Sequence, residues 1–127
     1  MTPRFIVIDH IVLIIKDLKK SEKFYSAFLG KPTHKDKYSI AYQIGETKLF
    51  LGLPYGKLKR KIFDKEEIGL NHLAFGIRKL PELKALEQTL KKARIKNSGI
   101  QIDKYGKTPF IWFDDPDDIR LEFYLRK

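Results

Sequence analysis

The stretches "VIDHIVLII" (residues 7–15) and "GLNHLAFGI" (residues 69–77) decide the fold of this chain. Each is a short apolar run with one histidine near its beginning, and the two can be aligned so that His10 falls on His72. Runs of this length and composition are typical of strands. A polar side chain at the same place in both runs needs an explanation, and it directs the search for a functional site.

The similarity between the two stretches continues into the residues that follow them. Residues 8–30 align with residues 70–92, and in both copies the apolar run gives way to apolar residues at helical spacing. Asp17 suits the N-cap of the first helix and Gly30 its C-terminal end, while Pro81 suits the first turn of the second helix. The sequence therefore predicts two copies of one module.

Short strands are expected after each helix. The segments "YSIAYQIGETKLFLGL" (residues 38–53) and "GIQIDKYGKTPFIWFDDPDDIRLEFYL" (residues 99–125) alternate strand-forming runs with turn residues. Each half then has the order β-α-β-β-β, which indicates an α+β protein. We expect a single domain over residues 1–127, in which residues 5–54 form module one, residues 55–69 a charged linker and residues 70–126 module two.

The composition excludes several classes of protein. A chain of 127 residues is the size of one domain, and 43% hydrophobic with 33% charged residues fits neither a membrane span nor a disordered chain. The sequence has no cysteine, so disulfides and thiolate ligands are excluded. The first ten residues lack the features of a signal peptide. We expect a cytoplasmic protein with no membrane partner.

The formal net charge of +10 raises the question of nucleic acid. Lysines occur along the whole chain, with the densest group in "KLKRKIF" (residues 57–63), and no zinc-finger spacing or RNP-like motif accompanies them. A solvated basic surface is the preferred interpretation. An anionic small-molecule substrate ranks second, and nucleic acid is the least favoured partner.

The two histidines differ in what surrounds them on their strands. Side chains alternate across a strand, so His10 shares a face with Val12, and because both faces of this run are apolar we expect both to be covered. His72 shares its face with Ala74 and Gly76. These small residues leave room on that face for something other than protein.

The last expected strand, "DIRLEFYLR" (residues 118–126), places Glu122 on one face between Arg120 and Tyr124. A carboxylate in such a strand needs a partner. Two imidazoles and one carboxylate suit a divalent metal with open coordination positions. The alternative is that the histidines are satisfied core residues and the glutamate pairs with a lysine. The remaining histidine, His34, is expected on the surface.

The segments "DHIVLIIKDLKKSEKFYSAFLG", "NHLAFGI" and "FDDPDDIRLEFY" resemble the vicinal oxygen chelate superfamily, which includes glyoxalase I, fosfomycin-resistance proteins, extradiol dioxygenases and the metal-free bleomycin-resistance proteins. The resemblance covers nearly the whole chain and implies paired modules that build a cupped mixed sheet, the glyoxalase-like fold. It also implies a metal held by residues of the first and last strands. In this chain, the residues at the ligand positions that the resemblance implies are His10, His72 and Glu122.

The chain departs from the superfamily pattern at several positions. The turn Asp117-Asp118 stands where the superfamily usually has Asp-Gly. Asp tolerates the left-handed backbone conformation of that glycine position better than most residues do. Phe50 stands where glyoxalase I-like members carry a fourth ligand, and phenylalanine cannot coordinate a metal. The remaining two-histidine, one-glutamate set resembles that of extradiol dioxygenases and fosfomycin-resistance proteins. However, Trp112 replaces the tyrosine of the former and Val12 the threonine of the latter, so no single reaction is indicated.

The resemblance implies an enzyme that binds a small substrate through two neighbouring oxygens on Fe, Mn, Zn or Ni, as a lyase, transferase or dioxygenase. Arg120 is a candidate for pairing with an anionic group, and Tyr124 or Tyr42 for donating a proton. Surface or packing roles are the alternative for all three. Apolar walls are expected from Phe50, Phe110 and Trp112.

Two further expectations follow from the resemblance. The competing function is a metal-free protein that binds and sequesters a small molecule, as bleomycin-resistance proteins do, although those usually lack the histidines. Superfamily members of this length resemble homodimers in which modules of two chains complete each cup. We therefore expect a homodimer.

Overall fold

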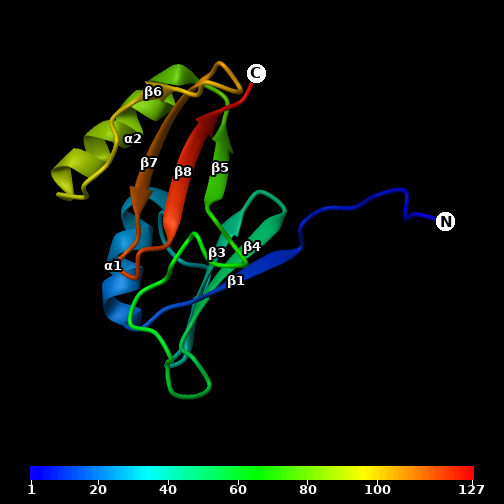
Figure 1. Ribbon diagram of the computed structural model, residues 1–127, viewed down its shortest axis with the longest axis vertical. Helices are drawn as coiled ribbons and strands as arrows, with labels where there is room; N and C mark the ends of the chain where they lie inside the picture. Colours follow the sequence, from blue (N-terminus) through cyan, green and yellow to red (C-terminus); the bar gives the residue numbers. More distant parts are fainter. The chain divides into compact units, whose positions relative to one another are not determined.

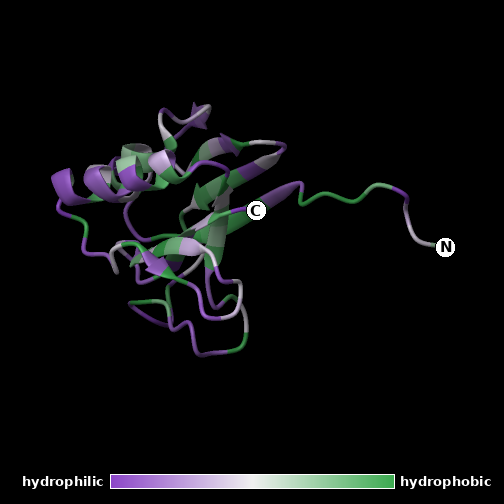
Figure 2. Ribbon diagram, turned by 90° about the horizontal axis from the view of Figure 1, so that it is seen from above, coloured by the Kyte–Doolittle hydropathy of each residue, from purple (hydrophilic) through white to green (hydrophobic).

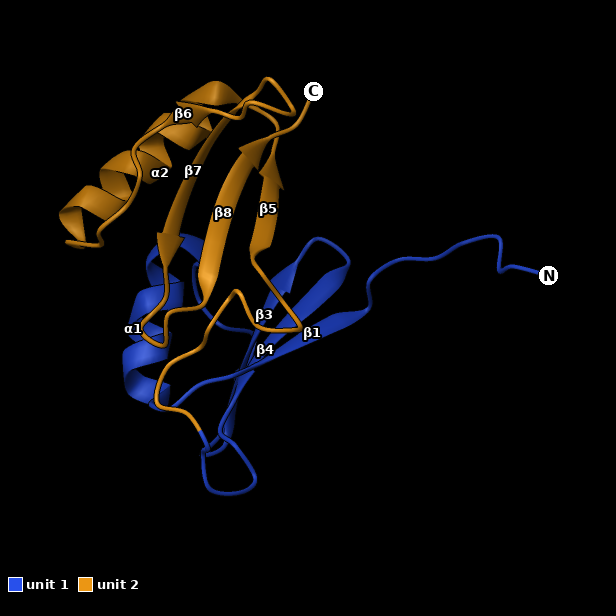
Figure 3. Cartoon of the chain, in the orientation of Figure 1, with its two compact units in different colours: residues 1–59 blue, residues 60–127 orange.

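The computed structural model describes residues 1–127 as two compact units, Met1–Lys59 and Arg60–Lys127 (Figure 3). Each unit contains one helix and one four-stranded sheet, in the chain order β-α-β-β-β. The prediction of an α+β protein with two tandem modules and mixed sheets is confirmed. Residues 53–72 contain no helix or strand.

The sheet of the first unit has the strand order β1-β4-β3-β2. The strand β1 runs parallel to β4, and the β3–β4 and β2–β3 pairs are antiparallel. Figure 1 labels β1, β3, β4 and the helix α1 of this unit. The bounds are β1 His10–Ile14, α1 Leu18–Leu29, β2 His34–Lys35, β3 Ser39–Ile44 and β4 Thr47–Gly52.

Both ends of α1 are fixed by the residues that the sequence predicts. The Asp17 side chain accepts a hydrogen bond from the Lys20 amide at 3.0 Å, and Gly30 ends the helix with a φ of 82°. This positive φ favours glycine. The helix packs on β3 and β4. Its fully buried residues are Ser21 and Tyr25, whereas Phe24 and Phe28 are half-buried.

The second unit repeats the arrangement, with the strand order β5-β8-β7-β6. Here β5 runs parallel to β8, and α2 packs on β7 and β8. Pro81 lies in the first turn of α2, as expected. The bounds are β5 Leu73–Ile77, α2 Leu80–Lys92, β6 Gln101–Ile102, β7 Pro109–Asp114 and β8 Arg120–Leu125.

The core of the second unit lies between its sheet and α2. Every second residue of β7 and β8 is buried there, and α2 contributes one apolar face. Burial of such side chains is the main stabilising contribution to the module. The alternating pattern leaves the other face of the sheet for Trp112, Arg120 and Glu122. The buried core residues are Phe75, Leu83, Leu86, Leu90, Ile111, Phe113, Leu121 and Phe123.

The two faces of β1 are not both covered, which corrects the expectation from sequence. Leu13 is buried on the helix side, but Val12 and Ile14, on the face that His10 shares, are 54% and 46% exposed. The preceding residues Phe5 and Ile6 are also exposed, at 75% and 74%. Figure 2 shows this N-terminal segment as a hydrophobic stretch that extends away from the sheet.

The turn between β7 and β8 has the conformation that the sequence predicts. Asp118 has a φ of 65°, in the left-handed region. The buried carboxylate of Asp115 accepts hydrogen bonds from the amides of Asp117 and Ile119, at 2.8 and 2.9 Å. These bonds hold the tight turn that sets where β8 begins.

No helix in the structure has the length and apolar composition needed to cross a membrane.

Candidate metal centre

Strand pairing places Phe50 and Glu122 at equivalent positions of the two modules. In the first sheet Phe50 pairs with Val12, which lies two residues after His10. In the second sheet Glu122 pairs with Ala74, which lies two residues after His72. Phe50 is therefore the counterpart, in the first module, of Glu122 in the second.

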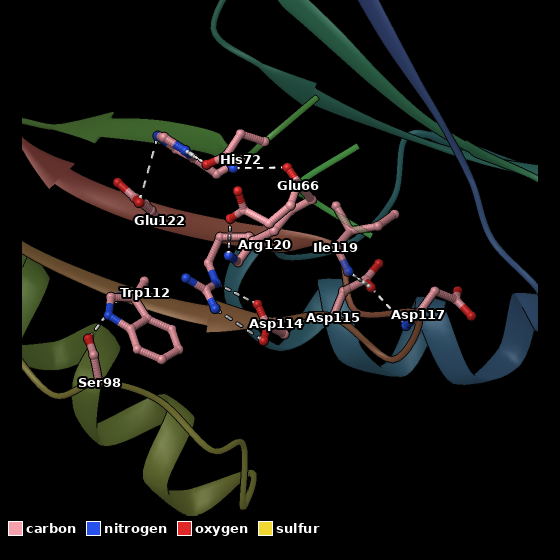
Figure 4. A network of polar contacts seen from close by, with 12 residues as sticks. Glu66, His72, Ser98, Trp112, Asp114, Asp115, Asp117, Ile119, Arg120 and Glu122 are labelled. Atoms are coloured by element: carbon pink, nitrogen blue, oxygen red, sulfur yellow. Dashed lines mark hydrogen bonds and ion pairs between the residues drawn. The ribbon is translucent and has the colours of Figure 1, made fainter. Parts of the chain in front are cut away.

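His72 and Glu122 lie together on the face of the second sheet that is turned away from α2 (Figure 4). His72 Nε2 is 3.7 Å from Glu122 Oε2, and the two side chains are 42% and 16% exposed. The Glu122 carboxylate has no hydrogen-bond partner in the structure. A carboxylate that is mostly removed from water with one imidazole beside it is short of partners, because burial without hydrogen bonds is costly.

The other nitrogen of His72 is bound to its neighbour in sequence. His72 Nδ1 lies 2.8 Å from Asn71 Oδ1, and the Asn71 side-chain amide donates to the Lys65 carbonyl at 2.9 Å. Two hydrogen bonds and an ion pair thus connect the loop before β5, through Asn71 and His72, to Glu122. The loop thus supports the ring from the side opposite the glutamate.

His10, in the first unit, also contacts the side chain of the residue before it. Its Nδ1 is 2.7 Å from Asp9 Oδ2, and its ring meets the Phe50 ring edge-on with centroids 5.8 Å apart. The phenyl ring thus occupies, beside His10, the place that the carboxylate occupies beside His72. No group of three or more His, Asp or Glu side chains arranged to hold a metal is present in the structure.

Arg120 lies on the same sheet face as Glu122 and is already paired. Its guanidinium donates to Asp114 at 2.6 Å from Nε and stacks on the Trp112 ring, 3.9 Å from the ring centroid (Figure 4). The carboxylate neutralises the charge, and the stacking fixes the plane of the guanidinium. Trp112 is therefore a platform for Arg120 as well as an aromatic surface on this face.

The Tyr124 hydroxyl donates to Asp103 Oδ2 at 2.7 Å. This hydrogen bond raises the pKa of the phenol above its usual value of 10.0 and lowers that of the Asp103 carboxyl below 3.8. The same carboxylate oxygen accepts from the Gly106 amide at 2.7 Å. A Cβ atom at Gly106 would overlap the Tyr124 hydroxyl, so the turn after β6 requires glycine here. Tyr124 is thus a neutral donor held by this turn.

The other polar candidates lie elsewhere. Tyr42 is buried on the helix side of the first sheet, where its hydroxyl is 2.8 Å from Ser26 Oγ and burial raises its pKa. The expectation that Tyr42 faces a substrate does not fit this position. His34 is exposed, as expected, and contacts Asp36 through Nε2 at 3.2 Å.

A hollow of about 600 Å³ lies beside the loop before β5. It is lined by loop residues of both charges together with Asp114 and Asp118, but not by His72 or Glu122.

Sequence reasoning did not single out Asp9, Asn71 or Asp114. The dipeptides Asp9-His10 and Asn71-His72 were a usable signal, because each puts an oxygen acceptor next to an imidazole.

A family model matches nearly the whole chain. The family model described as "Glyoxalase/Bleomycin resistance protein/Dioxygenase superfamily" matches residues 7–123. The chain belongs to this superfamily. The match contains both histidines, Phe50 and Glu122, and ends just before Tyr124.

Individual proteins are similar to this chain over nearly their whole length. The uncharacterized protein YwkD of Bacillus subtilis (strain 168) is 32% identical, over 92% of this chain and 94% of its own. The fosfomycin resistance protein FosX of Listeria monocytogenes has a TM-score of 0.73 at 19% identity, covering 97% and 95% of the two chains. Lactoylglutathione lyase of Agrobacterium tumefaciens also has a TM-score of 0.73, at 17% identity, covering 98% and 96%. These two structures share the fold of this chain, while their names denote different functions.

Proposed function

We propose that this chain is a metal-dependent superfamily enzyme that binds a small substrate through two neighbouring oxygens. The observation that carries the proposal is the pairing of His72 Nε2 with the otherwise unpartnered carboxylate of Glu122 at 3.7 Å. Donors bound to one ion at about 2.0–2.2 Å each lie roughly 3–3.6 Å apart. The pair therefore fits a shared divalent ion with a small adjustment.

His10 completes the proposed ligand set by resemblance to the superfamily. With Phe50 in place of a fourth ligand, His10, His72 and Glu122 would hold the ion and leave positions for substrate oxygens. An ion of Fe, Mn, Zn or Ni would supply Lewis-acid chemistry, or oxygen chemistry in the case of iron(II). We further propose that residues 1–127, comprising module one (5–54), the linker (55–69) and module two (70–126), act as one domain in the cytoplasm.

The chain's own residues would orient the substrate. Arg120, held by Asp114 and Trp112, presents its remaining N–H groups in a fixed plane, which suits an anionic substrate group. Tyr124 keeps its proton through its bond to Asp103 and would act as a donor after that bond is exchanged. These two residues are the proposed catalytic groups, with Phe50, Phe110 and Trp112 as apolar walls.

Metal content by mass spectrometry tests the proposal. The wild type and His34→Ala, which alters an exposed histidine, should each hold about one ion per chain. His72→Ala and Glu122→Gln should lose at least about 90% of it, since each removes one of three ligands. The second candidate, a metal-free binding protein of the bleomycin-resistance type, is favoured if the wild type takes up none of Fe, Mn, Zn or Ni on titration.

We also propose a homodimer. The exposed apolar residues of the N-terminal segment and of β1 support it, because large apolar side chains gathered at one place mark interaction surfaces. The members of this set are Phe5, Ile6, Val7, Ile8, Val12 and Ile14.

A further inference from the structure

The tautomer of His72 follows from the hydrogen bonds around it. The Lys65 carbonyl can only accept, so the Asn71 nitrogen must be the atom that faces it. Asn71 Oδ1 then faces His72 Nδ1, and it too can only accept. The proton on a neutral His72 ring is therefore on Nδ1. Its lone pair is on Nε2, the nitrogen that faces Glu122.

A single contact assigns the same tautomer to His10. Asp9 Oδ2, 2.7 Å from His10 Nδ1, is a carboxylate oxygen and accepts from that nitrogen. The lone pair of a neutral His10 ring is thus also on Nε2. His34 shows that this is no general property of the chain, because its acceptor Asp36 faces Nε2 instead.

We propose that Asp9 and Asn71 are positioning residues that hold His10 and His72 in the Nδ1–H tautomer and so direct both Nε2 lone pairs to the metal. Hydrogen bonds of this kind orient metal-binding histidines and raise their basicity. The loop carbonyl of Lys65 orients Asn71 in turn. The tautomers follow from the hydrogen bonds alone, whereas the effect on metal rests on the proposed function.

The two positioning residues differ in charge. Asp9 offers a carboxylate and Asn71 a neutral amide, so the electron density given to the two rings differs. The first module, which carries Phe50 in place of a ligand, has the charged support. The second module, which carries Glu122, has the neutral one.

The tautomers can be measured in the metal-free protein by ¹⁵N NMR of the histidine rings. We expect protonated Nδ1 in His10 and His72, and protonated Nε2 in His34. Asn71→Leu should move the His72 signals toward a mixture of tautomers and leave His10 unchanged, while Asn71→Asp keeps an acceptor and retains Nδ1–H. An Nε2–H form of His72 in the wild type, or no change in Asn71→Leu, would overturn the assignment.

Zinc affinity by competition titration tests the positioning role. Asn71→Leu should weaken binding by about tenfold to a hundredfold, and Asp9→Leu likewise. Gln43→Leu, which removes an exposed amide that contacts no histidine, is the matched control and should bind as the wild type does. Equal affinity in Asn71→Leu despite an altered tautomer rejects the positioning role. A wild type that takes up none of Fe, Mn, Zn or Ni rejects the proposed function and leaves the tautomer result intact.

Discussion

At the scale of single residues, the side chains of the proposed site are held by short polar contacts on one face of the second sheet. Each candidate side chain has a hydrogen-bond partner that helps to fix it: Asn71 for His72, Asp114 for Arg120 and Asp103 for Tyr124. A fixed side chain loses little conformational freedom when a ligand binds. The face is therefore built in advance of any substrate.

Tyr124 should titrate above pH 10. Its neutral phenol donates to the Asp103 carboxylate, and ionisation would place two negative charges together, so its pKa is raised above 10.0. The stability from this contact is present below pH 10 and is lost as pH rises through the raised pKa. Asp103→Asn should lower the pKa of Tyr124, as followed by ¹³C NMR of tyrosine Cζ, with Tyr124→Phe to assign the signal. An unchanged pKa in Asp103→Asn would contradict this account.

Gly106→Ala should destabilise the second module because the new methyl group overlaps the Tyr124 hydroxyl. Forced overlaps of this kind cost about 1–3 kcal/mol. Urea unfolding of Gly106→Ala in the wild type and in a Tyr124→Phe background measures the effect. The cost should be smaller in the second background, where the hydroxyl is absent. Equal costs in the two backgrounds would place the strain elsewhere.

At the scale of elements, the β7–β8 turn determines which residues of β8 face the site. The Asp115 carboxylate binds two amides of this turn, and Asp118 adopts a left-handed φ at its end. Since side chains alternate along a strand, the residue at which β8 begins decides whether Glu122 faces His72 or the core.

Asp115→Ala should cost about 2–4 kcal/mol of unfolding free energy, because it removes two hydrogen bonds to a buried charged group. Asp115→Asn keeps an acceptor oxygen and should cost clearly less. Chemical denaturation of both variants gives the comparison. Similar losses for both would show that the charge of Asp115, and not its role as acceptor, stabilises the turn.

At the scale of the whole molecule, one module occurs twice, and the proposed site has Phe50 in the first copy where the second has Glu122. The sequence was sufficient to predict the order of elements and the helix ends at Asp17 and Gly30, because these depend on local patterns. The resemblance placed Phe50 at the position of a fourth ligand, and the strand register shows that this position corresponds to that of Glu122.

Other features depended on packing that a single sequence does not reveal. Tyr25 is buried while Phe24 and Phe28 are half-buried, since apolar residues at helical spacing do not show which of them points straight at the sheet. Alternation along β3 allows Tyr42 on either face, and packing places it against α1. The exposed face of β1 was assigned as covered because apolar composition does not identify the partner that covers it.

The exposed apolar segment yields a prediction for assembly. Phe5→Glu combined with Ile6→Glu should shift the chain from dimer to monomer in sedimentation velocity, because charge on an apolar contact surface opposes association. Lys57→Glu combined with Lys59→Glu, in the exposed basic segment, is the control for a change in net charge. A wild type that sediments as a monomer would contradict the homodimer proposal.

The matching register of the two modules limits how the length of this chain can vary in evolution. A one-residue insertion in β4 or β8 would turn Phe50 or Glu122 to the opposite face and bring core residues to the surface. The same insertion within residues 53–64 alters neither a strand nor the Lys65–Asn71 contact. Length differences among functional homologues should therefore collect in that segment and spare the strands.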